Sequence, residues 1–239
     1  MFLIYIIVRD LVQYDNKYKK RLLYIVIISG MITSIIGIDN LTTNCFKPIL
    51  VAMGNVIQDN NENRMVGAFF YANTFGIAVA LSLIVALGIF LDEKNLIKKG
   101  ILSSVIFILT SSLILSYSRG TFVLVSLIFI LLFILIKDKE KRIKYIKLLI
   151  LEIIGSLIYT TLFSKLQFNR EYMLIWILAL IESFIISISI ICLEKFDKHL
   201  ENIELKKILV IIISLIVLSI SYIIIGLKLP EELTLFENG

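Results

Sequence analysis

The segment Arg64–Gly76, RMVGAFFYANTFG, carries a single arginine at the start of a long apolar run, and the segment Ser116–Thr121, SYSRGT, places another between two apolar runs. An arginine next to lipid is costly unless it reaches water or an anion. These two segments are therefore the first places to look for a binding site. The apolar runs around them decide the fold.

The composition is that of an integral membrane protein. Of the 239 residues, 59% are hydrophobic and 18% are charged, and the mean hydropathy is +0.95. A soluble domain usually has roughly 45–50% apolar residues. Long runs of Ile, Leu and Val between short charged segments indicate helices rather than the alternating strands of a membrane barrel. We therefore predict an all-α, polytopic transmembrane helix bundle in which residues 1–239 form a single domain.

Seven apolar runs have roughly the length of one membrane span, which is about 20 residues. They are residues 22–38, 65–91, 101–117, 121–136, 148–163, 172–193 and 208–227. The apolar residues 1–8 are too few to cross the membrane alone, and we interpret them as a partial N-terminal span. The stretch from 101 to 136 is broken only by Ser-Arg-Gly, and Gly120 allows the tight turn that would fold it into a hairpin.

Lysine and arginine are dense in alternate connections between these runs. The dense connections are residues 9–21, 92–100, 137–147 and 194–207. The positive-inside rule places them in the cytoplasm, so we predict a multi-pass protein of the plasma membrane. Arg64, Arg119 and the C-terminus would then be extracytoplasmic. The basic residues follow the topology and form no face interleaved with aromatic residues, so we expect membrane lipids and no nucleic acid as partners.

Polar residues accompany Arg64 along the helix that is predicted to begin there. A step of 100° per residue places Tyr71 on the same stripe as Arg64. Asn73 lies beside a second stripe of small residues, including Ala72 and Gly76, which would let another helix approach closely. This helix would therefore combine a polar face with a packing face.

Hydroxyl groups surround Arg119, with Ser116 and Ser118 just before it. A guanidinium group presents a planar fork of donors that suits phosphate oxygens, and neighbouring hydroxyls can complete the shell. The alternative for Arg64 and Arg119 is an anchor to phospholipid headgroups, with the polar neighbours only bonding adjacent helices. The residues alone leave both interpretations open.

Two acids lie within apolar runs. Glu182 falls near the middle of its run, where a charge is expensive; it could carry a proton, pair with a basic group, or stay protonated and bond a serine. Glu152 lies near the cytoplasmic end of its run, and we expect it to reach the interface beside Lys147 in a structural role. The single histidine, His199, is expected in the inner connection. With only two separated cysteines besides, we expect neither a metal site nor a cofactor.

The two arginine segments resemble hallmarks of the O-antigen ligase-like membrane family, which includes ligases and polymerases of lipid-linked polysaccharides. The first is Arg64–Gly76, and the second is the hairpin segment LILSYSRGTFVLV at residues 113–125. The resemblance implies a transferase at the outer membrane face that moves a glycan from a polyprenyl diphosphate lipid to an acceptor hydroxyl. It also implies that Arg64 and Arg119 hold the diphosphate, without metal or nucleotide.

The chain departs from that family at its C-terminal end. The family carries a large external loop with a histidine after these spans, whereas this chain ends with KLPEELTLFENG at residues 228–239. His199 is expected on the wrong side of the membrane to replace that histidine. We therefore expect an incomplete enzyme with a missing C-terminal portion: a fragment, one part of a split protein, or a diverged remnant. A proton-coupled secondary transporter that uses Glu182 and a non-catalytic membrane subunit stay open as alternatives.

Overall fold

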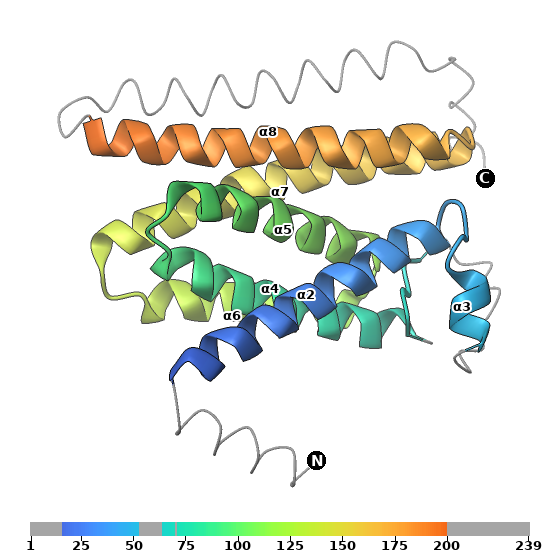
Figure 1. The fold of residues 1–239 in the computed structure, drawn as a ribbon, viewed down its shortest axis with the longest axis horizontal. Coiled ribbons are helices and arrows are strands. Elements are labelled where there is room, and N and C mark those ends of the chain that lie inside the picture. Colours follow the sequence, from blue (N-terminus) through green and yellow to red (C-terminus); the bar gives the residue numbers. More distant parts are fainter. Residues whose placement is uncertain (1–15, 53–63, 70, 200–239) are drawn as a thin grey trace, which may run out of the picture.

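The computed structural model describes residues 16–52, 64–69 and 71–199 (Figure 1). Throughout these residues the regular elements are all helices, which confirms the predicted all-α class. They are α2 (Asn16–Asn40), α3 (Lys47–Ala52), α4 (Ala72–Asp92), α5 (Leu96–Leu115), α6 (Arg119–Leu135), α7 (Lys139–Phe168) and α8 (Tyr172–His199).

Five of these helices, α2, α4, α5, α7 and α8, are long and apolar enough to cross a membrane. α6 is apolar but has only 17 residues. The structure is thus compatible with a membrane-embedded protein. The predicted count of seven spans is not established, because the partial span 1–8 and the last span 208–227 lie outside the described residues.

α5 lies at the centre of the bundle and packs against α4, α7 and α8, while α2 packs on α4 and α5. Aromatic side chains fill the middle of α5 and α7. The Phe107 and Tyr159 rings meet edge to face with centroids 5.7 Å apart, and Tyr159 meets Phe163 in the same way at 5.9 Å. Large apolar side chains also point outward from the bundle, on α4, α6 and α8. That pattern suits helices that are surrounded by lipid.

The long helices run in alternate directions along the chain (Figure 1). α2, α5 and α7 finish at the end of the bundle where α4, α6 and α8 begin. We name this end the arginine end, because Arg64 and Arg119 lie there, and we name the opposite end, with the connections 93–95 and 136–138, the lysine end. The predicted break is confirmed, because α5 stops at Leu115 and α6 starts at Arg119. The turn expected at Gly120 is wrong: Gly120 lies in the first turn of α6, and Tyr117 takes the positive φ, at 48°.

The helix predicted to begin near Arg64 begins instead at Ala72, so the prediction for residues 65–71 was wrong. Gly67 has a φ of +58°, which interrupts a right-handed helix. A Cβ atom at Gly67 would lie 2.7 Å from the Phe75 ring and 2.8 Å from the Thr33 carbonyl oxygen. Only glycine fits this turn, and residues 64–66 before it have no regular secondary structure.

All four basic segments predicted as connections are partly helical, including those at the start of α7 and at the end of α8. α7 already starts at Lys139, where the Asp138 carboxylate caps the helix by accepting a hydrogen bond from the Glu140 backbone N–H at 3.0 Å. Lys144 adds a 2.6 Å ion pair with Glu140 one turn away. α8 likewise continues to His199 rather than ending at residue 193. Neither segment contains Gly or Pro, so a helix that leaves the apolar region has no reason to stop there.

Candidate functional site

Arg64 binds the end of α5. Its Nε donates to the Ser116 carbonyl oxygen and its Nη2 donates to the Tyr117 carbonyl oxygen, both at 3.3 Å. The next backbone N–H, that of Met65, donates to the Leu115 carbonyl oxygen at 3.0 Å. The carbonyls at a helix C-terminus lack helical partners and carry partial negative charge, so a guanidinium group is well placed there. Arg64 is therefore held at a fixed position at the arginine end.

A pocket of about 760 Å³ opens beside Arg64. It contains three cationic side chains, those of Arg64, Lys165 and Arg170, and no carboxylate lines it within the described part of the chain. The other lining residues are apolar, aromatic or uncharged: Leu41, Leu115, Tyr117, Ser164, Gln167, Phe168 and Tyr172. An open pocket with several cations and an apolar wall suits an anionic group attached to an apolar chain.

Two of the lining residues have backbone conformations that are rare for residues other than glycine. Tyr117 has a φ of 48° directly after α5, and Arg170 has a φ of 60° directly after the end of α7. Such conformations cost on the order of 1–3 kcal/mol each and occur often at functional sites. Both residues place their side chains at the same pocket. The strain thus coincides with the charged cavity.

A second polar group joins the first turns of α4 and α6. Ser118 caps α6, and its Oγ donates to Asn73 Oδ1 at 2.9 Å and lies 2.6 Å from Thr121 Oγ1. Beside this group, a Cβ atom on Gly76 would lie 2.8 Å from Thr121 Oγ1. The predicted close approach of a helix to the small-residue stripe is therefore confirmed, and the approaching helix is α6.

The structure brings only some of the predicted site residues together. Arg64 meets the backbone of Ser116, whose side chain turns back to the Leu113 carbonyl oxygen. Asn73 meets Ser118, as described above. Arg119 lies exposed in the first turn of α6, and Tyr71 is 68% exposed before α4; neither lines the pocket that holds Arg64.

Lys165 and Arg170 were missed by the reasoning from sequence. They were counted as the two basic residues of the connection predicted after residue 163, where they served only to assign topology. Lys165 in fact lies in the last turn of α7, and Arg170 follows that helix. A signal was present, because each is a cation beside a long apolar run at the end where Arg64 lies. Their convergence on Arg64 could not be read from the sequence, since it depends on how α7 packs against α5.

The two acids within the bundle differ from expectation. Glu152 was predicted to reach the interface beside Lys147, but its side chain is 1% exposed. The prediction failed because α7 starts at Lys139 and thereby places Glu152 several turns inside the helix. Glu182 is fully buried, and among the described residues neither of its carboxyl oxygens has a hydrogen-bond partner, so it does not bond a serine. His199, predicted in a connection, is the last residue of α8.

Comparisons with known proteins give one partial similarity. The chain is similar to the protein named "Putative glycosyltransferase MJ1113" of Methanocaldococcus jannaschii, with 34% identity over 101 residues. That region is 42% of this chain and 31% of the other protein, so the chain spans about a third of the length of the curated relative that it matches. No protein-family model and no solved structure matches the chain.

Proposed function

We propose that this chain is part of a membrane glycan transferase of the O-antigen ligase-like type, which takes its glycan from a polyprenyl diphosphate lipid at the extracytoplasmic face. The observation that carries the proposal is the pocket at the arginine end, where the three cationic side chains of Arg64, Lys165 and Arg170 converge beside an apolar wall. The likeness of the two arginine segments to that family, and the partial similarity to a protein named as a glycosyltransferase, support the same class.

The chemistry of such a transfer matches what this pocket offers. When an acceptor hydroxyl attacks the anomeric carbon, the bond to the lipid diphosphate breaks and negative charge grows on the diphosphate. Fixed cations that face this charge lower the barrier to the reaction. Arg64 is held in place by the end of α5, so its guanidinium group needs little reorganisation as the charge develops. The apolar wall would take the first units of the polyprenyl chain.

Arg119 has a different place in this proposal. It is exposed at the first turn of α6, at the same end of the bundle but outside the pocket lining. In this proposal Arg119 either contacts the diphosphate on the side that carries the glycan or attracts the substrate as it approaches the pocket. Ligase and polymerase reactions need the same handling of the donor, so the proposal covers both.

Glycan transfer from a polyprenyl diphosphate donor, measured in membranes that contain the whole protein, tests this proposal. We expect Arg64→Lys and Arg119→Lys to lose most of the activity, because lysine lacks the planar fork of donors. Arg21→Lys is the matched control, since Arg21 is exposed on the first turns of α2 at the lysine end and stacks on Tyr18. Full transfer by the Arg64 and Arg119 variants would contradict the proposal.

A further inference from the structure

A stripe of buried polar side chains runs along the face of α7 that packs against α5 and α8. It consists of Glu152, Ser156 and Tyr159, each at most 1% exposed. Glu182 on α8 is equally buried. Among the described residues, no side-chain oxygen of these four has a hydrogen-bond partner. We name these four residues the α7–α8 seam.

The packing of the two helices places Glu182 beside Tyr159. A Cβ atom on Gly155 would lie 2.7 Å from Ile186 Cδ1, which fixes the level at which the antiparallel helices cross. Tyr159 comes one turn after Gly155, and Glu182 comes one turn before Ile186, so the two share a level. Glu152 lies on the other side of that crossing, nearer to the lysine end. The two acids therefore lie in the same contact between α7 and α8, at two different positions along the helix axes.

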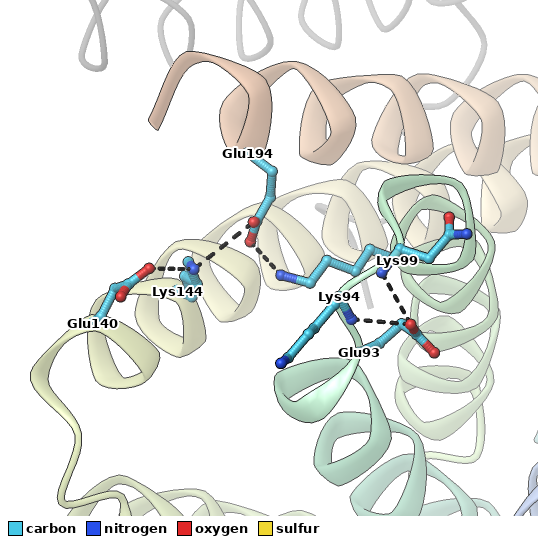
Figure 2. A network of polar contacts seen from close by, with 7 residues as sticks. Glu93, Lys94, Lys99, Glu140, Lys144 and Glu194 are labelled. Atoms are coloured by element: carbon cyan, nitrogen blue, oxygen red, sulfur yellow. Dashed lines mark hydrogen bonds and ion pairs between the residues drawn. The ribbon is translucent and has the colours of Figure 1, made fainter. Parts of the chain in front are cut away.

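The basic residues near this face are already engaged. Figure 2 shows the cluster at the lysine end, where Lys99 Nζ lies 2.7 Å from Glu194 Oε1 and Lys144 Nζ lies 2.6 Å from Glu140 Oε1 and 3.9 Å from Glu194 Oε2. Glu194 thus pairs with Lys99, whose positive charge could otherwise have balanced a carboxylate of the seam.

Within the described residues, no cation is bonded to either acid of the seam. Among the side chains that the structure describes on the three helices packed here, the other buried titratable groups are Lys99 on α5, Tyr145 and Tyr159 on α7, and Glu194 on α8. An unpaired carboxylate in such surroundings costs far more than a neutral carboxylic acid. The neutral acid also has an O–H group that can donate to a neighbouring hydroxyl.

We propose that Glu152 and Glu182 form a proton-binding site within the α7–α8 seam, in which each side chain carries a proton while the two helices are packed. If the seam opens to water, both acids can ionise and release their protons. Proton binding is therefore coupled to the packing of α8 on α7. The site does not depend on the proposed glycan transfer, because it is built from other residues and lies away from the arginine end.

Reaction with dicyclohexylcarbodiimide, an apolar reagent that attacks protonated carboxyl groups, tests the proposal on the full chain in detergent or vesicles. The carboxylic acid adds across a C=N bond of the reagent, and the adduct rearranges to a stable N-acylurea with no leaving group. Mass spectrometry of peptides then identifies the labelled residue. At about pH 8, where an ordinary glutamate with a pKa near 4.3 is ionised, we expect labels on Glu152 and Glu182.

Glu140 provides the matched control, because it is an exposed acid on the same helix. We expect no label on Glu140, loss of the corresponding label in Glu152→Gln and Glu182→Gln, and an infrared C=O band of protonated carboxyl groups that weakens in both variants. The wild-type labelling pattern alone is informative if a variant fails to fold. Absence of both the label and the infrared band from the folded protein would overturn the proposal. Protection of the two acids from the reagent by sodium ions, but not by potassium ions, would also overturn it, because the site would then bind sodium rather than protons.

Discussion

Arg170 combines an unfavourable backbone conformation with a charge at the pocket, so its two roles can be separated. At a φ of 60°, glycine is more favourable than arginine. We expect Arg170→Gly to raise the free energy of unfolding by about 0.5–1 kcal/mol and to weaken the binding of inorganic diphosphate. Arg170→Ala should weaken binding to the same degree without the gain in stability. Thermal unfolding and equilibrium binding on the same purified samples measure both effects.

A result in which Arg170→Gly lowers stability would show that the conformation carries no strain at this position. A result in which diphosphate binding is unchanged in both variants would remove Arg170 from the site. These outcomes are independent, so either conclusion can fail without the other.

At the level of single residues, the sequence identified Arg64, Asn73 and Ser118 as polar groups at one end of the bundle, and the structure engages each of them in a specific contact. It did not identify Lys165 and Arg170, because their approach to Arg64 is made by helices far apart in the chain. It misplaced Glu152, since the depth of a residue depends on where its helix begins. Caps such as Asp138 decide that boundary, and they are weaker signals than hydrophobic runs.

At the level of elements, the contact between α4 and α6 requires that residue 76 has no side chain beyond its hydrogen atom. A methyl group there would lie 2.8 Å from Thr121 Oγ1, which already contacts Ser118. We expect Gly76→Ala to lower the free energy of unfolding by about 1–3 kcal/mol, because either Thr121 or the whole of α6 must move. Thermal unfolding in detergent measures this change.

Gly88 on the same helix is the matched control, since nothing lies within 4 Å of a Cβ atom built there. Gly88→Ala should leave stability unchanged or raise it by up to about 1 kcal/mol, as expected for alanine in place of glycine within a helix. Equal losses in the two variants would show that α4 does not tolerate alanine for reasons unrelated to α6.

The lysine end is held by the buried pair of Lys99 and Glu194, which joins α5 to α8 (Figure 2). We expect Lys99→Met to lower stability by about 3 kcal/mol, because Glu194 is left buried with only Lys144 at 3.9 Å. Lys99→Met combined with Glu194→Leu should recover much of that loss. Lys141→Met is the control, because its pair with Asp92 is exposed to solvent and contributes little to stability. A loss from Lys99→Met no larger than the control's would contradict this role.

The breaks between helices were predicted better than the helix ends. Two helices are separated near residues 118–120 as predicted, but residues 116–118 make the turn, and Gly120, which was expected to make it, is the second residue of α6. The partners of those helices were not predictable, because hydrophobic periodicity gives the buried side of a helix but not its neighbour. α6 accordingly packs on α4, a partner that no feature of the α6 sequence indicated.

For the whole molecule, composition and hydropathy were sufficient to predict an all-helical bundle with helices of membrane-spanning length. Alternate charge in the connections also predicted that Arg64 and Arg119 share one end. They do, because Arg64 binds the end of α5 and Arg119 begins α6. Which face of a membrane that end occupies is a prediction of the positive-inside rule. Modification of the exposed Cys45 by a membrane-impermeant maleimide in intact cells tests it: we expect labelling, and labelling only after the cells are broken open would reverse the orientation.

The central claim is that the pocket formed by Arg64, Lys165 and Arg170 holds the diphosphate of a polyprenyl lipid. Binding of polyprenyl diphosphate to the purified chain, with polyprenol as the neutral competitor, tests it most directly. We expect the diphosphate lipid to bind far better than the alcohol, and we expect Arg64→Ala to weaken its binding about tenfold or more, whereas Arg21→Ala leaves it unchanged. Equal affinity for the two lipids, or full binding by Arg64→Ala, would contradict the account.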